Sequence, residues 1–146
     1  MSFTFLDHTA DIAVKLNATD ADKLFQSATL ALLAVYFGRE SDEPTTQLGA
    51  TTEQSLRLQS EDGTSLLIDY LNELIYRFDA NGLLTISLQL TLIELGSPAQ
   101  LEGHLISTRY DPSKHFVQTE VKAATHHQVE IQRHDGELSA TVVFDL

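Results

Sequence analysis

The chain has 146 residues, which is the length of one domain, and 42% of them are hydrophobic, enough to fill one core. Its 9 lysines and arginines stand against 21 aspartates and glutamates, so the formal net charge is -12 and the protein repels a phosphate backbone. The composition therefore argues against tight nucleic-acid binding by this chain alone, and it predicts a single domain over residues 1–146.

Cysteine is absent, which excludes disulfides and zinc–thiolate sites and suits a reducing compartment. The longest apolar run, residues 30–37, is far shorter than the ~20 residues that cross a bilayer. No basic segment followed by an apolar stretch opens the chain. We therefore expect a cytoplasmic protein without a membrane segment. Its acidic surface favours cations or a basic protein partner, although net charge can also serve solubility alone.

The first half of the chain predicts strand, helix, strand, helix. Apolar residues alternate over residues 3–16, on both sides of a polar cluster at residues 7–11, which indicates extended structure. A sequence typical of a capping box at residues 19–22 opens a helix that should stop at Gly38, and residues 39–50 read as an exposed loop. A short strand around Leu56 and Leu58 then leads to a second helix, which begins after residues 61–63 and ends at Asn81-Gly82.

The second half predicts a meander of strands. The pattern changes to period two, which places Ile86, Leu88, Leu90 and Leu92 on one face of a strand. Further strands are expected over residues 101–108 and 116–124, and a hairpin turn at residues 134–136 precedes a last alternating strand. Helices early and strands late are typical of the α+β class, here with two helices covering one face of a mainly antiparallel sheet.

Sequence motifs of enzymes are scarce. The chain lacks a phosphate-binding glycine loop, a nucleophile elbow, a helical pair of zinc-binding histidines and an EF-hand loop. His126 and His127 are adjacent, so on a strand they would point to opposite faces and could not easily serve one site.

Two carboxylates remain as candidates for a site. Asp11 opens a strand and Asp145 closes the last one, next to the terminal carboxylate of Leu146. If the first and last strands are neighbours, these oxygen groups converge, and a hard cation such as Ca²⁺ or Mg²⁺ would relieve their repulsion. By spacing alone, two unrelated surface acids remain the simpler interpretation.

Four blocks of sequence resemble the archease family across essentially the whole chain. They are HTADIAV (8–14), IDYLNELIYRFD (68–79), EVKAATHHQVEI (120–131) and VVFDL (142–146). The resemblance implies an archease-like α+β fold. It also implies a non-enzymatic cofactor of the RNA-splicing ligase, which joins 3′-phosphate or 2′,3′-cyclic phosphate ends to 5′-hydroxyl ends in tRNA splicing and RNA repair. The cofactor would promote guanylylation of the ligase and its multiple turnover, and it would meet RNA only through that partner.

The resemblance also assigns residues. It implies calcium-binding aspartates at Asp11 and Asp145, with a main-chain oxygen of Leu146, and Mg²⁺ as the alternative metal. It implies contacts with the ligase at three further positions, His8, Lys122 and His127. The chain departs from the family pattern at His126, where tyrosine is common, and at Ala13, where glycine is common.

Two other functional classes remain open from the sequence. The same carboxylates could serve a metal-dependent phosphoester hydrolase, since a bound cation can activate water. A metal-free binding or chaperone-like module is the third reading. The roles of Asp7 and His126 are not assigned.

Overall fold

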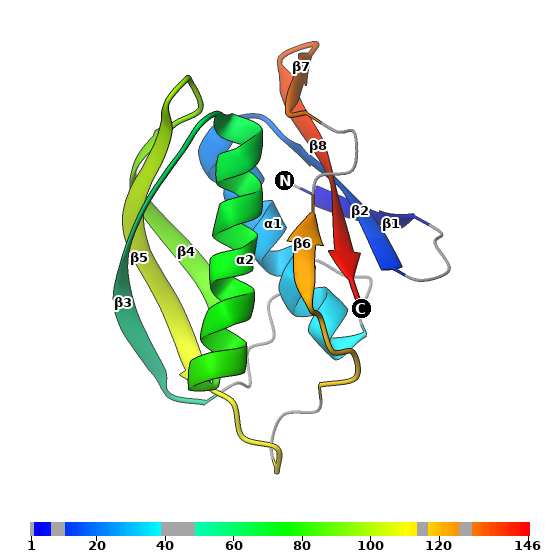
Figure 1. Ribbon diagram of the computed structural model, residues 1–146, viewed down its shortest axis with the longest axis vertical. Helices are drawn as coiled ribbons and strands as arrows, with labels where there is room; N and C mark the ends of the chain where they lie inside the picture. Colours follow the sequence, from blue (N-terminus) through cyan, green and yellow to red (C-terminus); the bar gives the residue numbers. More distant parts are fainter. Residues whose placement is uncertain (1, 7–10, 39–48, 114–116, 126–129) are drawn as a thin grey trace.

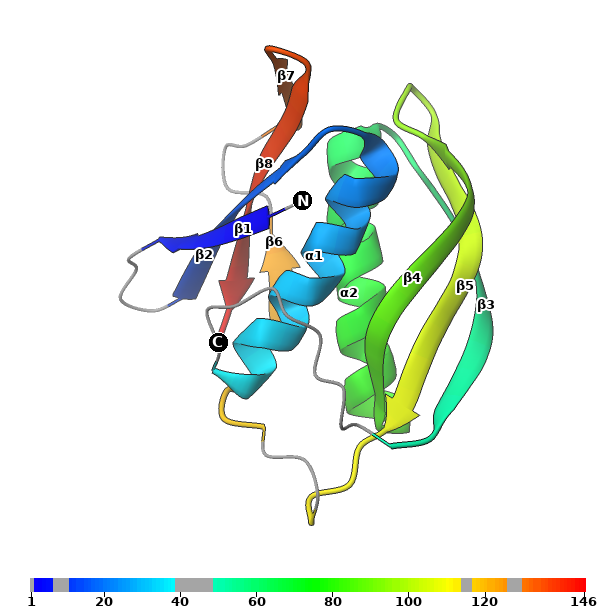
Figure 2. The same ribbon diagram turned by 180° about the vertical axis from the view of Figure 1, so that it is seen from behind.

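The protein has two helices between two antiparallel sheets (Figures 1 and 2). The computed structural model describes residues 2–6, 11–38, 49–113, 117–125 and 130–146. The α+β class and the antiparallel strands are confirmed, but the strands form two sheets rather than the one expected. Each sheet therefore has a face turned toward the helices, and the core lies in both gaps.

The larger sheet holds both ends of the chain. Its strand order is β1 (Ser2–Leu6), β2 (Asp11–Ala18), β8 (Glu137–Asp145) and β6 (Ala123–Thr125), with β7 (Gln132–His134) also paired to β8. The smaller sheet has the order β3 (Thr51–Ser60), β5 (Ala99–Arg109) and β4 (Leu83–Glu94). Strand β2 pairs with one edge of β8. Strands β6 and β7 both pair with the other edge, β6 at the Asp145 end and β7 at the Glu137 end.

Helix α1 (Ala21–Phe37) is the central element. It begins after Asp20, whose carboxylate accepts a hydrogen bond from the Lys23 amide at 2.8 Å, and it ends at Gly38 with a left-handed φ of 66°. The last turns are buried on every side, because the helix contacts both sheets. This explains the continuous apolar run at residues 30–37, which a helix covered on only one face would not need.

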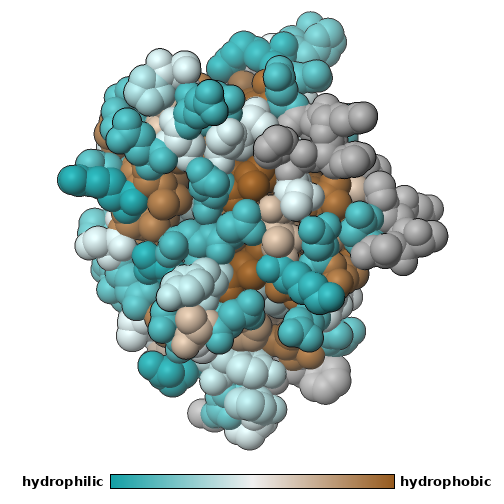
Figure 3. Space-filling model, viewed as in Figure 1, coloured by the Kyte–Doolittle hydropathy of each residue, from teal (hydrophilic) through white to brown (hydrophobic). Residues whose placement is uncertain are grey.

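Helix α2 (Gly63–Asn81) has one buried and one exposed face. Asp62 caps its first turn, so the helix begins within the turn expected at residues 61–63, and Gly82, at a φ of 67°, ends it as the sequence predicts. Leu67, Leu71 and Leu74 are buried, whereas Tyr76 is 61% exposed. Figure 3 shows this side of the molecule, where hydrophilic and apolar side chains alternate rather than forming one large apolar area. Among the described residues, neither helix is both long and apolar enough to cross a membrane.

Strand β4 departs from the expected period of two. Its register with β5 shifts between Thr85 and Ser87 and again between Leu90 and Leu92. After the second bulge Ile93, not Leu92, lies opposite the buried Leu101, so the prediction that Leu92 shares the core face of Leu90 is wrong. A bulge adds one residue and so inverts the faces beyond it, which the alternation of apolar letters does not reveal.

The strand predicted over residues 116–124 is largely wrong. Only Ala123–Thr125 is a strand, and residues 117–122 run without regular structure over the end of α1. There the amides of Gln118 and Thr119 both donate to the carbonyl oxygen of Tyr36, at 2.8 and 3.3 Å. These hydrogen bonds to a helix end replace the ladder that a strand would need.

Candidate functional site

Asp11 and Asp145 lie directly opposite each other in the structure. They are the last paired residues at one end of the antiparallel ladder between β2 and β8. Side chains opposed in this way have Cβ atoms about 4.5–5.5 Å apart, close enough for two negative charges to repel. The structure thus brings together the two carboxylates that the sequence singled out, and both are half-buried.

The alternation of β2 and β8 explains why these acids share a face. Val14 and Leu16 on β2, and Val142 and Phe144 on β8, point into the core between sheet and helices. Asp11 and Asp145 have the opposite parity, so their side chains are on the sheet face turned away from the helices. The buried residues of the two strands therefore fix the position of the carboxylate pair.

The short strand β6 completes the edge of the sheet beside the pair. Ala123 lies opposite Asp145, and the Lys122 amide donates to the Asp145 carbonyl oxygen at 2.8 Å. The Lys122 side chain is exposed. Leu146 follows at the end of β8 and is 38% exposed. Figure 1 shows this end of the chain beside β6. Lys122 and Leu146 are thus neighbours of the carboxylate pair.

Asn72 of α2 holds β6 in place, and the sequence alone did not single it out. Its side-chain amide donates to the Ala124 carbonyl oxygen at 3.0 Å, and its side-chain oxygen accepts from the Ala124 amide at 2.8 Å. This two-point contact satisfies both backbone groups of one residue. In the sequence, Asn72 stands out only as a polar residue within the apolar face of the IDYLNELIYRFD block.

Several predicted positions fall outside the described residues. These are His8 and His127, predicted to contact the partner, and the unassigned Asp7 and His126.

The donor set fits a hard cation better than a soft one. Two carboxylates and a main-chain oxygen are the ligands that Ca²⁺ and Mg²⁺ prefer, and Ca²⁺ completes about six to eight positions with carbonyls and waters. Within the described ranges, no group of three or more histidine, aspartate or glutamate side chains gathers as a metal cluster. Any cation here would therefore rely on main-chain oxygens and water beside the two aspartates.

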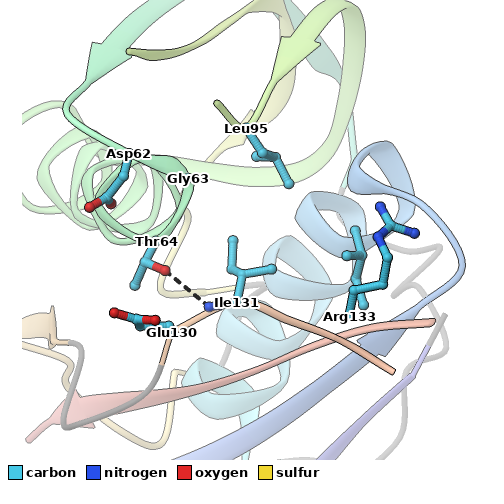
Figure 4. A pocket seen from close by; sticks show the side chains of 8 residues that line it. Asp62, Gly63, Thr64, Leu95, Glu130, Ile131 and Arg133 are labelled. Atoms are coloured by element: carbon cyan, nitrogen blue, oxygen red, sulfur yellow. Dashed lines mark hydrogen bonds between the residues drawn. The ribbon is translucent and has the colours of Figure 1, made fainter. Parts of the chain in front are cut away.

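A surface hollow of about 420 Å³ lies elsewhere, where α2 begins (Figure 4). Leu95, Ile131 and Leu138 give it an apolar floor, and the Thr64 hydroxyl accepts a hydrogen bond from the Ile131 amide at 3.0 Å. Leu138 is at the opposite end of β8 from Asp145, about 24 Å away at ~3.4 Å per residue. The hollow is therefore separate from the carboxylate pair.

Comparisons with known proteins cover nearly the whole chain. Residues 3–146 match the model of the Archease protein family (MTH1598/TM1083). The chain is 30% identical over 145 residues to the protein archease of Methanosarcina mazei, covering 99% of this chain and 95% of that one. It is also 30% identical over 146 residues to the protein archease of Archaeoglobus fulgidus, with both chains covered completely.

Two solved structures share the fold. The solution structure of protein 1598 from Methanobacterium thermoautotrophicum is 31% identical, with a TM-score of 0.77 and coverage of 99% of this chain and 98% of that one. A crystal structure of an archease from Thermotoga maritima, described as a possible chaperone, is 21% identical, with a TM-score of 0.59 and coverage of 97% and 94%. From the matched family model and the relatives of equal length, we conclude that the chain belongs to the archease family.

Proposed function

We propose that this protein activates an RNA-splicing ligase that joins 3′-phosphate or 2′,3′-cyclic phosphate ends to 5′-hydroxyl ends. It promotes guanylylation of the ligase and multiple turnover, as the resemblance to archeases implies. The observation that carries the proposal is the opposition of Asp11 and Asp145 across β2 and β8. This register places two anionic side chains side by side at one end of the sheet, which is the arrangement that a cation with oxygen ligands needs.

In this proposal the pair holds Ca²⁺, with Mg²⁺ as the alternative. Asp11 and Asp145 supply anionic oxygens, and a main-chain oxygen of Leu146 completes the protein's share of the ligands. When bound, the cation would cancel the repulsion between the two carboxylates and present positive charge at an otherwise acidic edge. Lys122, which borders the pair, would contact the ligase together with His8 and His127.

The protein acts through its partner rather than as an enzyme. The sequence offers no thiol nucleophile, no phosphate-binding loop and no evident pairing of a nucleophile with a base. The net charge of -12 disfavours direct contact with RNA and favours a basic protein surface. The protein would therefore meet RNA only through the ligase, in the cytoplasm.

A ligation assay with catalytic amounts of ligase tests the proposal. RNA with a 3′-phosphate and a 5′-hydroxyl end is incubated with the ligase, GTP and metal, with and without this protein. We expect the ligase alone to stop after about one turnover and to continue when the protein is added. Equal product with and without the protein would contradict the activator role, and RNA cleavage by the protein alone would favour the hydrolase reading.

A further inference from the structure

Strand β3 is an open edge of the smaller sheet. It pairs with β5 on one side, and in the described part of the chain no strand, turn or loop forms a main-chain hydrogen bond with its other side. Figures 1 and 2 show β3 at the outside of the molecule, on the rim of its sheet. Such an edge presents a row of amide and carbonyl groups that can pair with a further strand.

The edge lacks the features by which proteins commonly prevent such pairing. The sequence of β3, TTEQSLRLQS, contains no proline, glycine or lysine, and its register with β5 is continuous from Thr51 to Ser60. The other edge strand of the same sheet, β4, has two bulges, and the edge strand β1 of the larger sheet has only 5 residues. Of these three edges, β3 is therefore the longest regular one, at about 33 Å for ~3.3 Å per residue.

Alternation gives β3 one face toward the helices and one toward solvent. On the inner face, the Arg77 guanidinium of α2 donates to the Gln54 side-chain oxygen at 3.0 Å, and the Ser60 hydroxyl donates to the Asp69 carboxylate at 2.6 Å. The outer face consists of the odd-numbered residues of β3, and all of them are exposed. The side chains of α2 therefore contact the inner face of β3 and leave its outer face open.

The outer face has a self-complementary charge pattern, because Glu53 and Arg57 flank Ser55 at equal distances along the strand. Their side chains are 57% and 81% exposed. Contacts between copies of one chain are most often twofold, so that each residue meets the other's counterpart. When two β3 strands lie antiparallel about an axis through Ser55, Glu53 of each copy is opposite Arg57 of the other. The strand is neutral, so the net charge of -12 is carried by the rest of the chain.

Two registers give the greatest overlap, and the charges distinguish them. An axis through Ser55 or through Leu56 pairs all but one of the 10 residues of β3 with the second copy. An axis between two residues would set inner-face side chains opposite outer-face ones. The axis through Ser55 forms two pairs of opposite charges, whereas the axis through Leu56 sets Glu53 opposite Gln59. The Leu56 side chain gains little there, because the residue is already only 5% exposed.

We propose that two copies of this chain associate by antiparallel pairing of their β3 strands, with the twofold axis at Ser55. The pairing joins the two three-stranded sheets into one continuous sheet of six strands. Asp11 and Asp145 belong to strands of the other sheet, so each copy keeps its carboxylate pair outside the paired strands. The inference does not depend on the ligase.

A single cysteine tests the register, because the chain has none of its own. Ser55→Cys places a thiol opposite its copy, where Cα atoms of an antiparallel pair are about 4.5–5.5 Å apart, within reach of a disulfide. Gln59→Cys is the matched control, exposed on the same face but about 27 Å from its copy at ~3.4 Å per residue. After mild oxidation, a non-reducing gel should show a covalent dimer of Ser55→Cys only. No dimer, or as much dimer in the control, would overturn the proposal.

Charge reversal tests what selects the second copy. Glu53→Arg and Arg57→Glu each set like charges opposite one another, so each variant alone should associate about tenfold or more weakly than the wild type. An equal mixture of the two variants restores opposite charges and should regain the association of the wild type. Glu137→Arg and Lys23→Glu make the same changes in net charge at exposed residues outside β3 and should change it little.

Sedimentation equilibrium measures these associations at about 0.1–1 mM, where a small transient interface forms. Glu53→Arg makes the chain less negative, so overall repulsion predicts stronger association, whereas pairing of β3 predicts weaker association. A monomeric wild type, or a mixture of the two variants that stays monomeric, would overturn the proposal. If the β3 amides of a monomeric wild type became protected from hydrogen exchange only after ligase is added, the edge would belong to that partner instead.

Discussion

Asp11 and Asp145 are opposed at one end of a ladder whose other end pairs Ala18 with Leu138. The register is continuous between these two pairs, and the alternate residues of both strands are buried. A slip of one residue would turn those buried side chains toward solvent, so the register is strongly specified. The buried side chains of β2 and β8 therefore fix the position of the two acids, because they fix the register of the two strands.

The repulsion between these acids should be measurable without metal. In the presence of a chelator, Asp145→Asn should raise the melting temperature by up to about 4 °C, because opposed like charges cost about 0.2–1 kcal/mol in a domain of this size. In excess Ca²⁺ the order should reverse, because only the wild type gains the energy of binding. Differential scanning calorimetry with Glu137→Gln as control checks both signs, and a destabilised variant in chelator would contradict the expected repulsion.

Asn72 should affect calcium binding, although it is bonded to β6 and not to the two aspartates. Asn72→Ala leaves both backbone groups of Ala124 without their partners, which should cost about 2 kcal/mol of unfolding free energy. Because β6 borders Asp145, Ca²⁺ affinity should also fall. Urea unfolding and calcium titration measure the two effects. Asn81→Ala, at the exposed end of the same helix, is the control and should change neither.

The two buried tyrosines should respond in opposite ways to loss of the hydroxyl. Tyr70→Phe removes the hydrogen bond with Thr29, within the core, and should lower the unfolding free energy by about 1–2 kcal/mol. Tyr36→Phe removes a group with no partner in the described structure and should not lower it. Chemical denaturation of both variants makes the comparison, and equal destabilisation would indicate that Tyr36 has an intramolecular partner.

Direct RNA binding should be weak. With a net charge of -12, the protein should not bind a fluorescent single-stranded RNA at physiological salt below micromolar concentrations. Anisotropy measurements with and without the ligase distinguish direct from indirect contact. Tight binding by the isolated protein would contradict this prediction. It would mean that the attraction of a local basic surface for RNA outweighs the repulsion from the net negative charge.

The sequence predicts features correctly where they depend on neighbouring residues and where the pattern of buried residues agrees with them. Helix α2 begins within the turn expected at residues 61–63 and ends at Gly82 as expected, since turn and capping chemistry is local. The pairing of Asp11 with Asp145 needed one further assumption, that the strands at the two ends of the chain are neighbours, and the structure confirms it.

Other features could not be predicted, because they depend on distant contacts. The bulge before Leu92 is set by the pairing of β4 with β5, where Gly103 allows the backbone of Gln89 to approach closely. A Cβ atom at position 103 would be 2.3 Å from the Gln89 carbonyl oxygen. The contact between Asn72 and Ala124, and the hydrogen bonds from Gln118 and Thr119 to the Tyr36 carbonyl oxygen, likewise join segments far apart in the chain.

The rate of ligase guanylylation tests the central claim most directly. The ligase is incubated with radiolabelled GTP and Ca²⁺ together with wild-type protein, Asp11→Asn, Asp145→Asn or the control Glu137→Gln, and labelled ligase is followed with time. We predict that wild type and control accelerate labelling equally and that each asparagine variant loses at least about tenfold of that acceleration, since each removes one anionic ligand. Full acceleration by both asparagine variants would contradict the account.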